Sequence, residues 1–355
     1  MESIKNLQES LNTNQCAVIL SPHNRFYFTQ MESSDGLLIV SRQKAELFID
    51  FRYIEAAQKN CSSLISVILK QKDDLFYIEQ FVSENKISMV LIEGDYINAS
   101  FYLALSEKLK GMAEIETELG ILSKLRDVKS LKQLDKIKAA QEITDKVYAE
   151  LLNEIHSGIS ERQLKSRLIY LLYKYGADGL AFEPIVVSGE NSSLPHGTST
   201  DRIITAGDFV TMDFGAVKDG WCSDMTRTVA IEYADDNHIK VYKTVLKAQQ
   251  LAMEQVKAGA LCSDVDKAAR QFIYDSGYEG YFGHSTGHGV GVLVHESPNV
   301  SPKNQSPLKI GNVITIEPGI YMDNRFGCRI ENMVYVLENG YENLTKSPTE
   351  LFIVK

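Results

Sequence analysis

Two aspartates near the middle of the sequence, Asp213 and Asp224, stand beside apolar stretches in which a carboxylate is unusual. A Lys-Asp-Gly turn signal at 218–220 separates them, and a β-favouring run at 225–230 follows. The pattern predicts two strands joined by a turn, with the two carboxylates facing each other. Burying a carboxylate is costly unless it is paired, hydrogen-bonded or bound to a metal. The alternative is that Asp213 ends a strand and Asp224 belongs to a turn, neither with a chemical role.

The later sequence decides against that alternative, because similar residues recur in apolar surroundings. Glu317 stands at the end of the apolar run 313–316, and Glu331 stands within the run 329–336. A single strand glutamate is usually exposed and structural, but this concentration favours a site. Four of the protein's seven histidines fall in the same half of the chain and near these runs: His196, His284, His288 and His295.

The types of these residues indicate a metal centre. Carboxylate-rich sites with one imidazole suit hard or borderline divalent ions such as Mn²⁺ or Co²⁺ better than a thiolate-seeking zinc site. Four carboxylates carry more negative charge than one dication balances, so we expect two metals that share bridging carboxylates. Two such ions, about 3.5–4 Å apart, hold a hydroxide between them and stabilise charge on the oxygen that is attacked.

The elements that position these residues divide into two regions. The first ~120 residues predict a separate α/β unit. It carries no cluster of metal-ligand types in its sequence, so we expect a scaffold, a lid or a dimer-building domain. Its predicted elements are strands at 17–21 and 87–92, a hairpin at 36–40 and 46–50, and helices at 51–59 and 100–110.

The second region begins after a charged stretch at 123–130, which we interpret as a connector. A long helix follows from Leu131, and a capping-box pattern at 160–163 predicts a second helix that runs to about residue 175. Two further helices are expected at 237–257 and 263–276. The order helix, helix, strand hairpin occurs twice and suggests an internal repeat.

Composition limits the classes of function. At 355 residues the chain exceeds the usual size of one core, and its net charge of −10 argues against a nucleic-acid partner. The N-terminus lacks the pattern of a signal peptide, and no apolar run approaches the ~20 residues that cross a membrane. The five cysteines show no CxxC spacing. We therefore expect a cytoplasmic protein without a membrane partner.

Taken together, the motifs resemble the pita-bread metallopeptidases, which include prolidase, aminopeptidase P and methionine aminopeptidase, with the metal-free creatinase as a relative. The likeness covers the last ~230 residues strongly, and the N-terminal part is similar to the creatinase type, most clearly at 22–29. The segments that carry it are Leu194-Pro-His196-Gly197, Thr211-Met-Asp213-Phe-Gly215, Ser223-Asp224-Met-Thr-Arg227, Gly287-His288-Gly-Val-Gly291, Val294-His295-Glu296, Ile316-Glu317-Pro-Gly319 and Arg329-Ile-Glu331.

The resemblance implies an α/β (α+β) fold with two domains and a homodimer. Residues 1–123 would form a creatinase-type N-terminal α/β domain. Residues 124–355 would form the pita-bread catalytic domain, with pseudo-twofold helices over a curved antiparallel sheet.

The resemblance also assigns metal ligands. Asp213 would chelate one metal, Asp224 and Glu331 would bridge the two, and His288 and Glu317 would complete the other. Glu317 would in addition act as general base or proton shuttle for the bridging water. The cofactors would be two divalent ions, Mn²⁺ first, with Co²⁺ or Zn²⁺ as alternatives.

Further residues would act on the substrate. By the same resemblance, His284 and His295 would bind substrate and stabilise the oxyanion, and His196 would contact substrate near the scissile bond. Arg329 would orient Asp213; the alternative for Arg329 is a surface ion pair.

The implied reaction is hydrolysis of an N-terminal Xaa-Pro bond in peptides with proline at the second position. The nitrogen of this tertiary amide must be protonated as it leaves, which a metal-bound hydroxide and a shuttle carboxylate together provide for. Asn299 stands where several dipeptide-specific prolidases have an arginine that can pair with a dipeptide's carboxylate. We therefore favour an Xaa-Pro aminopeptidase, with a strict Xaa-Pro dipeptidase as the alternative.

Other members of the family fit less well. Methionine aminopeptidases usually lack the N-terminal domain, creatinase has lost the metal ligands, and a catalytically dead peptide-binding member would typically lose them too. Trp221, Cys328 and Asn332 depart from the common family residues, but none of them is an expected ligand.

Overall fold

The computed structural model describes residues 2–117 and 120–355. The chain divides into two compact units, one that ends at Arg126 and one from Asp127 to Lys355. Helix α6 (Gly120–Asp127) crosses this division, so most of the stretch interpreted as a connector is in fact helical. Its apolar residues recur at helical spacing, and Leu122 and Arg126 are buried.

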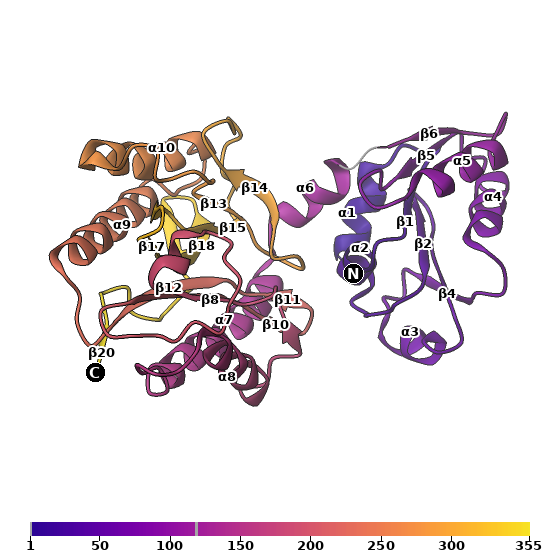
Figure 1. Cartoon of the computed structure of the whole chain (residues 1–355). Coiled ribbons are helices and arrows are strands. Elements are labelled where there is room, and N and C mark those ends of the chain that lie inside the picture. The colour runs from indigo at the N-terminus through magenta and orange to yellow at the C-terminus, as the bar shows by residue number, and fades with distance from the viewer. Residues whose placement is uncertain (1, 118–119) are drawn as a thin grey trace. The chain divides into compact units, whose positions relative to one another are not determined.

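The N-terminal unit is a six-stranded sheet in the order β4-β3-β2-β1-β5-β6, with helices around it (Figure 1). Strands β2 and β3 form the predicted hairpin, with Val40 opposite Ala45, and β1 runs parallel to β5. The elements are α1 (Glu2–Ser10), β1 (Gln15–Ile19), α2 (Pro22–Thr29), β2 (Leu37–Ser41), β3 (Ala45–Ile49), α3 (Ile54–Asn60), β4 (Ser66–Leu69), α4 (Asp74–Glu84), β5 (Met89–Ile92), α5 (Ala99–Lys108) and β6 (Glu114–Glu116).

Two helix pairs organise the C-terminal unit. Helices α7 (Leu131–Leu151) and α8 (Glu161–Lys174) both begin with a capping box, in which the side chains of Ser130 and Ser160 accept a hydrogen bond from the third residue of the helix. The box predicted at Ser160 is therefore confirmed. The second pair is α9 (Asp236–Glu254) and α10 (Cys262–Ile273).

The strands of this unit form several small antiparallel sheets. The largest have the orders β14-β13-β15-β18-β19 and β20-β12-β9-β8, with only β20 parallel to its neighbour. The strands are β7 (Gly179–Leu180), β8 (Ile185–Ser188), β9 (Phe209–Phe214), β10 (Ala216–Lys218), β11 (Trp221–Cys222), β12 (Met225–Ile231), β13 (Gly287–Gly289), β14 (Glu296–Val300), β15 (Val313–Ile316), β16 (Gly319–Met322), β17 (Phe326–Arg329), β18 (Asn332–Leu337), β19 (Gly340–Asn343) and β20 (Ile353–Val354).

Each helix pair packs on its own set of strands. One core joins α7 and α8 to β8, β9 and β12, with Leu168, Met212 and Val229 fully buried. The other joins α9 and α10 to β15 and β18, with Val245 and Val334 among its members. The helix–helix–strand order thus occurs twice, as the sequence suggests, and the strands of both halves meet at the centre of the unit (Figure 1).

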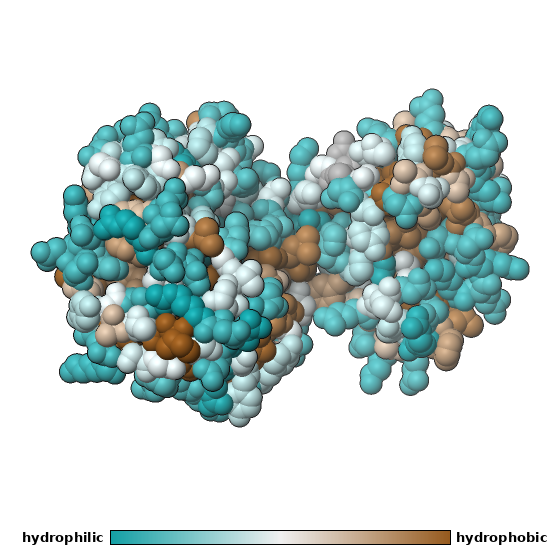
Figure 2. Space-filling view, in the orientation of Figure 1, coloured by the Kyte–Doolittle hydropathy of each residue, from teal (hydrophilic) through white to brown (hydrophobic). Residues whose placement is uncertain are grey.

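Hydrophilic residues cover most of the face shown in Figure 2, and hydrophobic residues lie there in small separate patches. Among the residues that the structure describes, none of the helices combines the length and the apolar character that a membrane span requires.

Candidate active site

The first two aspartates lie on or beside two paired strands but do not face each other directly. Asp213 lies in β9 opposite Thr226 of β12, and Asp224 lies just before β12 begins. Strands β9 and β12 pair antiparallel, but the connection between them is a second, shorter hairpin of β10 and β11 that contains the Lys-Asp-Gly turn. The predicted single hairpin is therefore two hairpins, one inside the other. Both carboxylates still reach the same site, because Thr226 and Asp224 lie on one face of the chain.

The two glutamates lie at breaks between strands. Glu317 follows β15 directly, as predicted, and Glu331 separates β17 from β18 rather than lying inside a strand. The backbone N–H of Glu331 donates to the carbonyl oxygen of Thr226 in β12, and not to a strand that pairs with β17 or β18. The chain passes from one sheet to another at Glu331, which turns the carboxylate toward the aspartates.

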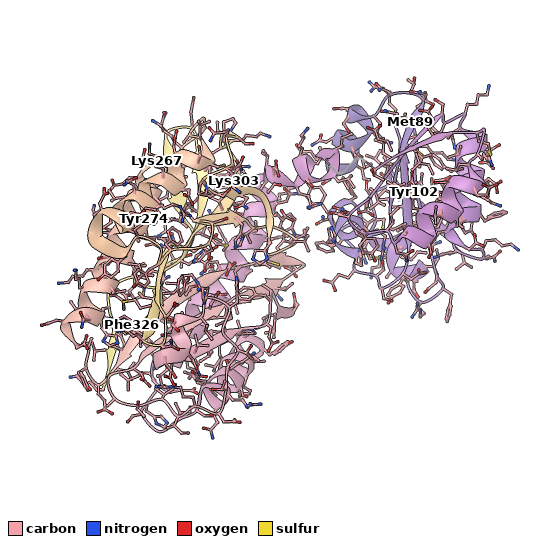
Figure 3. The ribbon with its side chains drawn as sticks, turned by 45° about the horizontal axis from the view of Figure 1, so that its top comes forward. Met89, Tyr102, Lys267, Tyr274, Lys303 and Phe326 are labelled. Atoms are coloured by element: carbon pink, nitrogen blue, oxygen red, sulfur yellow. The ribbon has the colours of Figure 1, made fainter. Side chains whose placement is uncertain are left out.

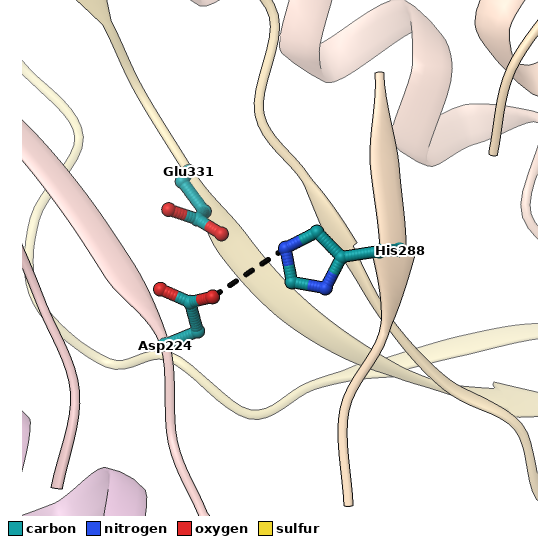
Figure 4. Close-up of side chains that lie close together, drawn as sticks. All are labelled: Asp224, His288 and Glu331. Atoms are coloured by element: carbon teal, nitrogen blue, oxygen red, sulfur yellow. Dashed lines mark ion pairs between the residues drawn. The ribbon is translucent and has the colours of Figure 1, made fainter. Parts of the chain in front are cut away.

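His288 lies in the middle strand of a tightly packed trio. A Cβ on Gly287 would lie 1.9 Å from the carbonyl oxygen of Thr315, and a Cβ on Gly289 would lie 2.1 Å from that of Ser297. Only glycine fits at these two positions, and the imidazole of His288 between them projects from the strand toward Asp224 and Glu331 (Figure 4).

These elements bring the ligand types together. Ligand atoms of Asp224, His288 and Glu331 all lie within 4.8 Å of one another (Figure 4). Nε2 of His288 is 3.5 Å from Oδ2 of Asp224 and 3.3 Å from Oε1 of Glu317. Asp213 belongs to the same group, because its charge contributes to raising the pKa of both Asp224 and Glu331.

Burial and mutual repulsion dominate the protonation of three carboxyl groups. Burial, followed by the charges of Glu331 and Asp213, raises the pKa of Asp224 well above its usual range. The pKa of Glu331 is raised in the same way, by burial and then by Glu317 and Asp213. Burial also raises the pKa of Asp213, although the Arg329 guanidinium opposes this shift.

His288 and Glu317 form an ion pair, with Nε2 of His288 3.3 Å from Oε1 of Glu317. Burial acts to lower the pKa of His288, but the hydrogen bond and charge of Glu317 reverse the effect and raise it to about 9. Burial acts to raise the pKa of Glu317, and its pairing with His288 lowers it to about 2.

The donor set fits divalent metal ions. Oδ1 of Asp213 and Oε1 of Glu331 are buried and accept no hydrogen bond from any residue in the described ranges. A buried carboxylate oxygen in that state is costly unless a cation binds it. Four carboxylates and one imidazole are suitable ligands for such ions.

The remaining three histidines surround the acidic group. Nε2 of His284 is 2.9 Å from the hydroxyl of Tyr321, and the ring of His295 lies 4.3 Å from that of His288. Burial lowers the pKa of His284 and of His295, and the charge of His196 contributes to lowering both. The structure thus gathers His284 and His295 at the site, with His196 close enough to influence them electrostatically.

The loop that carries His284 is fixed by a buried ion pair on α10. Arg270 binds Asp266 through two 2.8 Å contacts and donates to the backbone oxygens of Phe282 and His284. Asp266 also accepts from Thr286. A pocket of about 320 Å³ opens beside this pair, lined by residues that include Lys267 and Tyr274, which Figure 3 labels.

Two residues of the site were missed in the sequence. The hydroxyl of Tyr321 accepts from Arg329 at 2.7 Å as well as contacting His284. The hydroxyl of Thr226 donates to Oε2 of Glu331 at 2.7 Å. Thr226 could have been found, because it stands two residues after Asp224 and alternation along a strand places both on one face. Tyr321 carries no comparable signal, because its contacts depend on how β16 pairs with β17.

Comparison with known proteins gives the same assignment for both regions. Residues 135–338 match metallopeptidase family M24, and residues 4–128 match the creatinase/prolidase N-terminal domain. A Xaa-Pro dipeptidase of Pyrococcus furiosus is 35% identical over 338 residues, which are 94% of each chain.

Solved structures agree. An Xaa-Pro dipeptidase from Bacillus anthracis superposes with a TM-score of 0.95 at 35% identity, covering 99% of both chains. An X-Pro aminopeptidase from Thermotoga maritima gives a TM-score of 0.91 at 34% identity, covering 98% of this chain and 100% of the other. The predicted fold class, an α/β creatinase-type domain followed by a pita-bread domain, is confirmed. The chain belongs to metallopeptidase family M24.

Proposed function

We propose that the protein is a metal-dependent exopeptidase that hydrolyses the N-terminal Xaa-Pro bond of peptides. The observation that carries the proposal is the cluster of Asp224, His288 and Glu331, whose ligand atoms lie within 4.8 Å of one another. Relatives described as Xaa-Pro dipeptidase and X-Pro aminopeptidase support the choice of substrate.

The five residues proposed to hold two divalent ions are Asp213, Asp224, His288, Glu317 and Glu331. Bound ions would lower the pKa of a water and polarise the scissile carbonyl. We propose Mn²⁺ as the physiological metal, with Co²⁺ or Zn²⁺ as alternatives, because the donor set is rich in oxygen.

Side chains of the protein would transfer the proton and bind the substrate. Glu317, ionised in this protein, would accept the proton of the attacking water and pass it to the proline nitrogen as the amide breaks. His295 is held neutral by its lowered pKa, so it would donate one N–H to the carbonyl oxygen as negative charge develops there. The pKa of His284 is lowered too, but its Nδ1 donates to the carbonyl oxygen of Ser285, so His284 would donate to the substrate oxygen from Nε2 when both ring nitrogens carry a proton. His196 would contact the substrate beside the scissile bond.

We further propose an aminopeptidase that accepts peptides longer than two residues, with a strict dipeptidase as the second candidate. The observation that favours the first is Asn299, an exposed uncharged residue on β14. An arginine at this position could bind the carboxylate of a dipeptide, and asparagine cannot supply that charge.

The oligomeric state, the domain boundary and the location in the cell are also proposals. We propose a homodimer with a domain division at 123/124, on the basis of the family resemblance. We propose a cytoplasmic location, because all five cysteines are free thiols.

The test compares hydrolysis of an Xaa-Pro dipeptide and an Xaa-Pro-Yaa tripeptide by the Mn²⁺-loaded protein. We expect both to be cleaved, the tripeptide with the higher kcat/KM; cleavage of the dipeptide alone would establish the second candidate. Glu317→Gln should reduce kcat at least about 100-fold, whereas Glu338→Gln, on an exposed turn, should not. Binding of both peptides without hydrolysis would instead identify a peptide-binding member of the family.

A further inference from the structure

The segment between β8 and β9 carries His196 but has little regular structure of its own. Its one helical turn is the 3₁₀ turn Gly189–Ser193, and His196 is exposed beyond it. A segment of this kind is mobile unless side chains fix its backbone. Residues 188–200 therefore need side-chain contacts to hold His196 in one position.

Glu161 connects the two ends of this segment. The side chain is 0% exposed. One carboxylate oxygen, Oε1, accepts from the backbone N–H of Ser188 at 2.6 Å and from its hydroxyl at 2.9 Å. The other, Oε2, accepts from the backbone N–H of Thr200 at 2.9 Å and from its hydroxyl at 2.8 Å. Asn191 donates to both oxygens at 3.2 Å.

The position of Glu161 on its helix makes this anchor rigid. It is the first residue of α8, next to the capping Ser160, so its backbone is fixed by the capping box. Its side chain is directed to the segment 188–200, while the backbone N–H groups of Glu161 and Arg162 donate to the carbonyl oxygens of Arg202 and Thr200. An acidic residue in the first turn of a helix is also favoured by the helix dipole.

The middle of the segment is fixed by a residue of the active site. Nη1 of Arg329 donates to the carbonyl oxygen of Pro195 at 3.2 Å, one residue before His196. The same guanidinium binds Asp213. The segment is thus held at both ends by Glu161 and next to His196 by the group that orients a proposed metal ligand.

We propose that Glu161 is a positioning residue that sets the location of His196 relative to the scissile bond; this rests on the proposed function. A carboxylate is required because two acceptor oxygens are needed, one for each end of the segment. An amide has one acceptor oxygen, so the N–H and hydroxyl groups at one end of the segment would lose their side-chain acceptor.

The test uses Glu161→Gln, with Glu190→Gln as the matched control, because Glu190 is an exposed carboxylate in the same segment. Hydrogen exchange of the backbone amides of Ser188 and Thr200 needs no activity and is measured first. We expect exchange of one of them to accelerate at least about 10-fold in Glu161→Gln and to be unchanged in the control. Unchanged exchange at both amides would overturn the anchor even if the enzyme is active.

Kinetics then separate positioning from general destabilisation. With an Xaa-Pro-Yaa tripeptide we expect KM to rise at least about 10-fold in Glu161→Gln, with kcat changed less and the metal content equal to that of the wild type. In a His196→Ala background the same substitution should change KM less than about 2-fold, because the group that it positions is absent. An equal effect in both backgrounds would overturn the proposal.

Thr200→Val provides a second route if Glu161→Gln does not fold. It removes one donor from the anchor and keeps the carboxylate, so faster exchange at residue 200 and a smaller rise in KM are expected. Wild-type values of both would overturn the proposal. Absence of hydrolysis by the wild type would refute the proposed function and leave the exchange experiment as the test of the anchor.

Discussion

Nη2 of Arg329 donates a 2.6 Å hydrogen bond to Oδ2 of Asp213, and the guanidinium is almost fully buried beside it. The contact occupies one carboxylate oxygen and leaves Oδ1, the atom without a partner in the described structure, directed away from the arginine. Arg329 thereby selects which oxygen of Asp213 is available to a metal.

The first prediction follows from this contact. Arg329→Gln should weaken metal binding about 10- to 100-fold, because partners of metal ligands have effects of that size. A competition titration of Mn²⁺ against a chelator measures the dissociation constant directly. Arg325→Gln is the control, since Arg325 is exposed four residues earlier. Wild-type affinity in Arg329→Gln would show that the contact does not orient the ligand.

A second prediction concerns protons released by the metal. His288 has a pKa raised to about 9, so in the metal-free protein it is protonated at pH 7, and Asp224 and Glu331 have raised pKa values as well. Metal ligands must be deprotonated, so the affinity for Mn²⁺ should increase as the pH rises toward 9. Calorimetric titrations in buffers of different ionisation enthalpy should show at least one proton released per chain at pH 7. No proton release would mean that His288 is not a ligand.

The third prediction concerns stability. Asp224 is buried among like charges, so Asp224→Asn should stabilise the metal-free protein at pH 8 by about 1 kcal/mol or more, which is about 2–4 °C in Tm for a domain of this size. Saturating Mn²⁺ should raise the Tm of the wild type, because it binds the folded state, and should not raise that of Asp224→Asn. Thermal unfolding with and without the metal measures both, and an equal response of the two proteins would contradict the assignment.

Local sequence signals predicted the elements well. The capping box at Ser160, the hairpin of β2 and β3, and the four long helices of the C-terminal unit are present because each depends on residues close in the chain. The stretch at 123–130 was misjudged, because its charges concealed the helical spacing of the few apolar residues in α6.

Features that depend on contacts between residues far apart in the chain could not be predicted from the sequence. Glu331 was expected inside a strand, and only the transfer of the chain between two sheets shows that it stands at a break. The role of Glu161 was hidden for a similar reason. Glu161 lies within the capping-box pattern that begins α8, and that pattern gives no sign of a second role. Its carboxylate binds residues 27 and 39 positions later in the chain.

The last prediction concerns His295, whose neighbour Glu296 is held by Lys129. Nζ of Lys129 is 3.2 Å from Oε2 of Glu296, and both side chains are only 1% exposed. Glu296 also accepts from the backbone N–H of Leu293, so the pair fixes the turn that carries His295.

Removing the cation from this buried carboxylate should be strongly destabilising. Lys129→Met should lower the free energy of unfolding by about 3–5 kcal/mol, and adding Glu296→Gln should recover part of the loss, because a neutral amide then replaces the buried carboxylate. Arg162→Met is the control: its pair with Asp201 is 62% and 81% exposed, so a change below about 1 kcal/mol is expected. Denaturant unfolding of the four proteins gives these differences. If Lys129→Met were no more destabilising than Arg162→Met, the buried pair would not be what holds the turn that carries His295.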